Sequence, residues 1–159
     1  MNAGGRVVTL ARLRRIVEAL RRRGRRVVLA NGVFDVLHVG HLRYLRAAKR
    51  LGDVLVVAVN SDRSTRRLKG PGRPLAPAAD RARLVAALEP VDWVTVFDEP
   101  DVGYVIRALR PAVHAKGTDY TTDTVPERDV ARACGVRVRI VGDRKRHATR
   151  DLIARMGRG

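Results

Sequence analysis

Short runs of apolar residues alternate along the chain with segments in which apolar residues recur every three or four positions. The runs predict five β-strands, at residues 27–30, 54–59, 93–96, 112–115 and 136–141. The helically spaced segments predict α-helices at residues 10–23, 40–51, 78–88, 102–109, 126–134 and 149–156. Because strands joined by helices make right-handed crossovers, the alternation predicts an α/β protein with a Rossmann-like, doubly wound parallel sheet of five strands.

The chain has 159 residues, with no internal repeat and no long linker, which predicts a single domain over residues 1–159 that begins with a basic N-terminal helix within residues 1–26. The segment from Lys69 to Pro77 is rich in glycine and proline and therefore predicts a surface loop. Such a loop either closes over a substrate or only connects two elements. Ligands of this kind of sheet bind beyond the carboxyl ends of its strands, so the residues that follow the strands are the candidates for a site.

Residues 29–49 carry the clearest chemical signal. His38 and His41 lie three residues apart at the start of a predicted helix, after a strand and an Asn-Gly turn. A helix N-terminus attracts anions, and neutral imidazoles donate hydrogen bonds to phosphoryl oxygens, so the pattern indicates a phosphate site. The alternatives are a zinc pair, or one core histidine beside an exposed one. Gly32 and Gly40 favour the phosphate site because they allow a ligand to approach the backbone closely.

The stretch from Asn31 to His41, N-G-V-F-D-V-L-H-V-G-H, resembles the signature of the HxGH nucleotidyltransferase superfamily. Four further segments resemble the branch of that superfamily that makes ADP-heptose: A-V-N-S-D-R-S-T-R-R-L-K-G (58–70), R-P-L-A-P-A-A-D-R (73–81), A-L-E-P-V-D-W-V (87–94) and K-G-T-D-Y (116–120). The resemblance covers residues 25–156. It implies the HxGH nucleotidyltransferase fold and an enzyme that joins a nucleoside triphosphate to a phosphorylated small molecule and releases pyrophosphate.

The resemblance also implies a role for each matching residue. The implied catalytic residues are His38, His41 and Lys49, although the spacing of Lys49 alone is that of an ordinary exposed lysine. The implied nucleotide-binding residues are Asn31, Gly32, Val33, Phe34, Gly40, Lys116, Gly117, Asp119, Arg146, His147 and Thr149. The implied acceptor-binding residues are Asp35, Asn60, Asp62, Lys69, Arg81 and Tyr120. Mg²⁺ is the expected cofactor, held mainly by the triphosphate and not by protein ligands.

Two of the acceptor-binding residues have alternative roles. Asp35 either orders a loop or helps to hold metal-bound water. Asp62 follows a predicted strand, where an aspartate is often a helix cap or a turn former. The sequence leaves both alternatives open.

The chain departs from the family pattern at three places. Val33 stands where cysteine is usual, and Thr118 stands where a second glycine is usual. The usual Arg-Ser-Thr-Thr motif near the carboxyl end is replaced by His147-Ala148-Thr149-Arg150, so Ala148 and Arg150 stand where hydroxyl side chains are usual. Because hydroxyls at a helix start bond phosphate oxygens, Arg146, His147 and Arg150 are expected to supply compensating charge.

The net charge is strongly positive, since 33 Lys and Arg residues face 16 Asp and Glu residues, a formal charge of +17. The densest basic cluster, within residues 21–26, would suit nucleic acid or an anionic membrane, but it also matches the end of a solvated amphipathic helix. No apolar run approaches the ~20 residues that span a bilayer, and the N-terminus lacks a secretory signal. With a single cysteine, Cys134, the chain is expected to be cytoplasmic.

The expected reaction is the transfer of AMP from ATP to D-glycero-D-manno-heptose 1-phosphate by direct in-line displacement, which gives ADP-heptose and pyrophosphate. The first alternative keeps this chemistry with CTP or with another phosphorylated polyol. The second is a basic nucleic-acid-binding protein on a degenerate scaffold, and the presence of both histidines and Lys49 argues against it. A homodimer is expected, with no membrane partner and no specific nucleic-acid partner.

Overall fold

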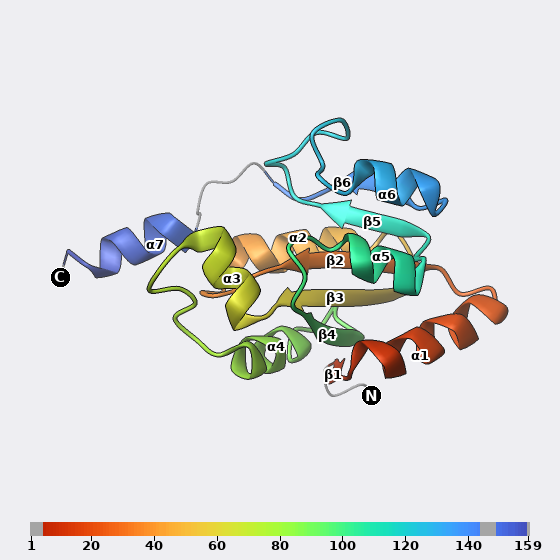
Figure 1. The fold of residues 1–159 in the computed structure, drawn as a ribbon, viewed down its shortest axis with the longest axis horizontal. Helices are drawn as coiled ribbons and strands as arrows, with labels where there is room; N and C mark the ends of the chain where they lie inside the picture. The colour runs from red at the N-terminus through yellow and green to blue at the C-terminus, as the bar shows by residue number, and fades with distance from the viewer. Residues whose placement is uncertain (1–4, 144–148, 159) are drawn as a thin grey trace.

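The computed structural model describes residues 5–143 and 149–158, and these form one sheet of six parallel strands in the order β1-β4-β3-β2-β5-β6 (Figure 1). The strands are β1 (Arg6–Val7), β2 (Val27–Gly32), β3 (Val54–Asn60), β4 (Trp93–Phe97), β5 (Val113–Lys116) and β6 (Arg137–Ile140). The helices are α1 (Leu10–Arg22), α2 (Val39–Lys49), α3 (Asp62–Lys69), α4 (Ala78–Ala86), α5 (Gly103–Leu109), α6 (Arg128–Ala133) and α7 (Thr149–Met156). None of the helices in this described part is long and apolar enough to cross a membrane.

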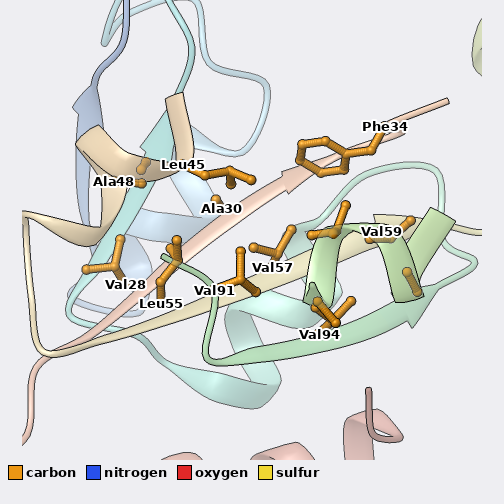
Figure 2. Close-up of a cluster of buried hydrophobic side chains, with 14 of the residues drawn as sticks. Val28, Ala30, Phe34, Leu45, Ala48, Leu55, Val57, Val59, Val91 and Val94 are labelled. Carbon is orange, nitrogen blue, oxygen red and sulfur yellow. The ribbon is translucent and has the colours of Figure 1, made fainter. Parts of the chain in front are cut away.

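The two faces of the sheet bury different helices. In β2, Val28 and Ala30 belong to the core under α2 and α4, whereas Val27 and Leu29 belong to the core under α1, α5 and α6. Figure 2 shows the first of these cores, in which Leu45 of α2 packs among side chains of the central strands. Because helices cover both faces, the strands read as continuous apolar runs in the sequence and not as alternating ones.

The predicted number of strands is wrong by one. β1 pairs only two residues with β4, at the edge of the sheet. A strand of two residues carries no readable pattern, and the backbone of its neighbour creates it. The other five strands and all six predicted helices are confirmed, with ends that differ by at most two residues.

Helix α3 is also absent from the sequence-based prediction. Its one apolar residue, Leu68, is exposed, so the segment has no apolar period. The helix begins because Ser61 caps it: the Ser61 hydroxyl accepts from the backbone N–H of Ser64 at 3.0 Å. Ser64 and Thr65 are fully buried, and the Asn60 amide at the end of β3 donates to the Ser64 hydroxyl at 2.9 Å. Tertiary contacts therefore define this helix.

The order of the strands reverses at β2. The chain runs from β2 through β3 to β4 on one side, and then crosses by way of α5 to β5 on the other side of β2. In such a sheet a crevice for ligands lies between the carboxyl ends of the two strands at the reversal, here β2 and β5. Figure 1 shows both strands pointing toward the end of the molecule at which α3 lies.

Candidate active site

The two motif histidines form a stacked pair at the start of α2. Their ring centroids are 4.0 Å apart, as expected from their spacing. Nδ1 of His38 accepts from the backbone N–H of Gly40 at 3.1 Å, and Nδ1 of His41 accepts from the backbone N–H of His38 at 3.3 Å. Since both Nδ1 atoms are acceptors, each neutral ring carries its proton on Nε2. The pair therefore presents two Nε2–H donors at the N-terminus of an 11-residue helix, where the helix dipole attracts anions.

The turn after β2 packs against this histidine pair. Phe34 has a positive φ of 52° and is buried, and its ring centroid lies 5.3 Å from that of His41. A Cβ at Gly32 would lie 3.0 Å from the Phe34 ring, which is tighter than an ordinary contact, so this position favours glycine. The Tyr44 hydroxyl donates to the carbonyl of Ala115 at 2.7 Å, and burial raises the pKa of this phenol. Helix α2 is therefore tied to β5 across the crevice.

Asp35 holds the glycine- and proline-rich loop in place. Its carboxylate accepts from the backbone N–H of Leu75 at 2.8 Å and of Ala76 at 3.1 Å, and from Nε of Arg73 at 2.7 Å. Burial alone would raise the pKa of Asp35, but these hydrogen bonds and the Arg73 charge bring it below its usual value. Of the two alternatives that the sequence left open, the structure shows the ordering of the loop.

Arg81 joins three segments of the site. Its fully buried guanidinium donates to the carbonyls of Ala76, Val33 and Asn60 at 2.7–2.9 Å and to the Asp62 carboxylate at 2.8 Å. Asp62 also accepts from the backbone N–H of Ala78. These polar groups bond to one another, so they build the frame of the site.

The carboxyl end of β5 forms the other wall of the crevice. Lys116 is buried, its ammonium lies 3.8 Å from Oε2 of Glu127, and the same ammonium lies 4.5 Å from the ring centroid of Tyr120. Burial lowers the pKa of Lys116, while the charges of Glu127 and Asp119 act in the opposite direction. A Cβ at Gly117 would meet open space. Asp119 lies in the segment after β5 and Lys69 ends α3, and both are exposed.

The structure contradicts the expectation that Lys49 reaches the phosphates. Its ammonium pairs with the carboxylate of Asp92 and donates to the backbone carbonyl of Asp53 at 2.8 Å. Asp92 in turn accepts from the backbone N–H of Leu55, at the amino end of β3. Lys49 is ten residues past Val39, the first residue of α2, which is ~15 Å along the helix axis, so the lysine lies at the opposite end of the strands from the histidines.

Three residues of this region were missed by the sequence-based predictions: Arg73, His114 and Glu127. His114 is fully buried in β5, and its Nε2 lies 2.9 Å from Oδ1 of Asn31 at the end of β2. A histidine inside an apolar strand next to a motif was a usable signal for this residue. Arg73 and Glu127 gave no such signal, because their partners are distant in sequence.

Part of the expected triphosphate site is not described. Arg146 and His147 lie outside the described residues. Thr149 begins α7, and neither its side chain nor that of Arg150 is described. The proposed compensation for the altered carboxyl-terminal motif stays a prediction. In residues 5–143 and 149–158, no group of three or more His, Cys, Asp or Glu side chains is placed to hold a metal ion.

The fold, with a histidine pair near the switch point of its sheet, is that of a nucleotide-binding α/β protein. The model of cytidylyltransferase-like proteins matches residues 29–156, and the chain belongs to that family. It is therefore an enzyme of the nucleotidyltransferase class, which confirms the class predicted from the sequence.

Relatives with known names agree with this assignment. The bifunctional protein HldE of Syntrophotalea carbinolica is 48% identical over 144 residues, which are 91% of this chain and 29% of that protein. HldE of Geobacter metallireducens is 51% identical over 126 residues, 79% of this chain and 26% of that protein. The chain thus spans less than a third of the length of these curated relatives. The crystal structure of a lipopolysaccharide core biosynthesis protein from Thermoplasma volcanium superposes with a TM-score of 0.63 at 36% identity, over 74% of this chain and 95% of that one.

Proposed function

We propose that the protein transfers AMP from ATP to D-glycero-D-manno-heptose 1-phosphate and releases pyrophosphate. The observation that carries the proposal is the stacked pair of His38 and His41 at the start of α2, beside the crevice between β2 and β5. The heptose acceptor is supported by the similarity to HldE proteins and by the segments that resemble the ADP-heptose branch.

Little proton transfer is needed in this reaction. A sugar phosphate is already an anionic nucleophile at neutral pH, so positioning and charge neutralisation dominate catalysis. The Nε2–H groups of His38 and His41 donate to the transferring phosphoryl group and to the leaving pyrophosphate. The backbone from Asn31 to Phe34, together with Gly40 and Gly117, approaches the nucleotide, and Lys116 and Asp119 complete this side. The preorganised donors stabilise charge where it develops in the transition state.

Mg²⁺ fits the site as an ion carried by the triphosphate. The carboxylate of Asp35 already accepts from protein donors, and the described residues contain no other cluster of ligands. Such an ion would be held mainly by the triphosphate, as the sequence predicts. When bound, the ion supplies neutralisation of charge on the triphosphate.

The loop that Asp35 and Arg81 hold forms the acceptor side of the site. We assign Lys69 and Tyr120 as contacts of the sugar phosphate, and Asn60, Asp62 and Arg81 as the frame that keeps this side in place. The proposal includes a single nucleotidyltransferase domain that forms a homodimer in the cytoplasm. Light scattering of the purified protein tests the dimer.

A panel of donors and acceptors tests the reaction. ATP and CTP would each be combined with heptose 1-phosphate and with glycerol 3-phosphate, and pyrophosphate release would be followed. Release with ATP and heptose 1-phosphate, at a kcat/KM above every other pair, supports the proposal. A preference for CTP or for glycerol 3-phosphate would contradict the proposed substrates but not the proposed nucleotidyl transfer. No release from any pair, together with salt-resistant and sequence-selective binding of an oligonucleotide, would favour a nucleic-acid-binding protein.

A further inference from the structure

The charged pair at the end of β5 is incompletely bonded. Glu127 is 5% exposed and Lys116 is 7% exposed. Their 3.8 Å separation is an ion pair but too long for a hydrogen bond, and Oε2 of Glu127 accepts no hydrogen bond from any described residue. A buried carboxylate in this state loses much of its hydration without full compensation. Such a group is a candidate for bonding by a ligand.

The position of Glu127 in the fold also indicates a role in binding a ligand. It is the residue before the first turn of α6, but its side chain makes no capping hydrogen bond and instead reaches Lys116. Next to Lys116 on β5, the fully buried His114 binds Asn31 through Nε2 and leaves Nδ1 without a hydrogen-bond partner among the described residues. Burial, and after it the charge of Lys116, lowers the pKa of His114 to about 3, so this ring is neutral. The wall therefore contains two unsatisfied acceptors beside one cation.

The chemistry of this wall matches a pair of hydroxyl groups. A carboxylate accepts a hydrogen bond from a hydroxyl, and an ammonium donates to the same or to the neighbouring hydroxyl oxygen. A carboxylate beyond a strand end at the switch point is a general means of binding sugar hydroxyls in such sheets. The histidine pair at the start of α2 and this wall at β5 follow the carboxyl ends of the neighbouring strands β2 and β5, so we infer that a ligand with phosphate at one end and hydroxyls at the other reaches both.

We propose that Glu127, with Lys116, binds a vicinal diol of a substrate, and that Glu127 is a specificity-determining residue of the enzyme. The carboxylate is almost fully buried, so the proposal requires a side chain beside the pair, such as the Tyr120 ring over Lys116, to shift when the diol binds. The inference rests on the proposed function, in which two substrates carry such diols: the ribose of ATP and the heptose of the acceptor.

Calorimetric binding to the full chain distinguishes the two sources. Dissociation constants would be measured for ATP, 2′-deoxy-ATP and 3′-deoxy-ATP, and for heptose 1-phosphate and its ring-deoxy analogues, with wild type and Glu127→Gln. We expect Glu127→Gln to weaken one diol-bearing substrate by ~10-fold or more, as for loss of a charged hydrogen bond. The analogue that lacks the contacted hydroxyl should bind equally to both proteins. If Glu127 binds the ribose diol, the effect of Glu127→Gln will depend on a hydroxyl in the ATP series. If it binds the heptose diol, the effect will depend on a hydroxyl in the acceptor series.

Equal effects on every ligand, or no effect, would overturn the inference and leave Glu127 only as the counter-ion of Lys116. Glu89→Gln is the matched control, because Glu89 is an exposed carboxylate with only a 3.9 Å partner. If Glu127→Gln does not fold, Glu127→Asp keeps the charge, shortens the side chain and is expected to show the same coupling. Absence of pyrophosphate release by wild type would refute the proposed reaction, whereas the binding ratios would still test the diol site.

Discussion

Lys49 and Lys116 each pair with a carboxylate, at opposite ends of the same sheet. At the amino end, the ammonium of Lys49 donates to Asp92 and to the carbonyl of Asp53, and Asp92 also accepts a backbone N–H. At the carboxyl end, Lys116 has its partner Glu127 at 3.8 Å, and the Glu127 oxygen accepts no hydrogen bond from a described residue. The first network is closed, and the second leaves hydrogen-bonding capacity unused.

The difference distinguishes a closed structural network from one that, in our proposal, a ligand completes. A closed network stabilises the fold, and nothing is gained from a ligand that would break it. An incompletely bonded network costs stability, which a fold retains where a ligand completes the bonding. The sequence-based expectation placed both lysines in the site, Lys49 as a phosphate contact and Lys116 as a nucleotide-binding residue. Of the two, only Lys116 lies at the carboxyl end of the sheet, where the candidate site is.

The largest expected effect comes from the histidine pair. His38→Ala or His41→Ala should each lower kcat by ~10²- to 10³-fold, because each removes a preorganised donor to the phosphoryl group. Loss of the helix cap should lower the free energy of unfolding by about 1 kcal/mol. Steady-state kinetics and urea unfolding measure the two effects. Val39→Ala, an exposed change between the two histidines, is the control, and full activity in either histidine variant would remove the pair from catalysis.

At the amino end, the effect should fall on stability alone. Lys49→Met leaves the Asp92 carboxylate without its cation, and the free energy of unfolding should fall by about 2–3 kcal/mol with little change in kcat. Unfolding and turnover would be measured on the same preparation, and Asp92→Asn would complete a double-mutant cycle. A large loss of kcat in a folded Lys49→Met protein would contradict a purely structural role for the Lys49 network and would indicate a catalytic role for this lysine.

Because His114 is buried in β5, we expect the free energy of unfolding to fall at acid pH. The folded pKa of His114 is about 3, whereas the unfolded value is 6.5, so below pH 6.5 the unfolded chain binds the proton that the folded chain excludes. The contribution to stability is lost as pH falls, by about 1.4 kcal/mol per pH unit, or about 2 kcal/mol between pH 7 and pH 5. Urea unfolding at both pH values measures it. His114→Gln should flatten the profile, and an unchanged slope in that variant would contradict the assignment.

A smaller effect is expected where the loop is anchored. Asp35→Asn weakens the pairing with Arg73 and should lower the free energy of unfolding by about 1–2 kcal/mol. Because the pKa of Asp35 is lowered in the folded state, its contribution is present above pH 3.8 and is lost as pH falls further. The loosened loop should raise KM for the acceptor more than it lowers kcat. Asp80→Asn, at an exposed carboxylate, is the control, and an unchanged KM would limit Asp35 to folding.

The smallest effect on turnover is expected at the basic cluster within residues 21–26, at the amino end of the sheet. Replacement of the five arginines within residues 21–26 by glutamine should leave turnover unchanged, because they precede β2 at its amino end. Any binding of nucleic acid by the wild type should be non-specific, with a Kd of ~10⁻⁴ to 10⁻⁶ M at physiological salt, and should disappear in this variant. Filter binding at two salt concentrations measures it. A loss of turnover would extend the site beyond the carboxyl end of the sheet.

Local sequence patterns were sufficient to predict most of the architecture. Apolar period and turn residues are properties of neighbouring positions, so they predict the long strands, most of the helices and the doubly wound class. The same holds for the histidine pair, because its three-residue spacing on a helix places the rings together. Where the local pattern is weak, as in β1 and α3, the prediction failed, since tertiary pairing and capping create these elements.

The roles of the charged residues were decided only by the tertiary structure. Lys49 and Asp92 are 43 residues apart, and His114 and Asn31 are 83 residues apart. A sequence shows that such groups exist but not which of them meet, because strand order and helix docking bring them together. Asp35 as a loop anchor, Arg81 as a buried clamp and Glu127 as the partner of Lys116 follow from that order. The sequence by itself determined the fold class and the histidine motif, and packing decided which polar groups are satisfied and which are not.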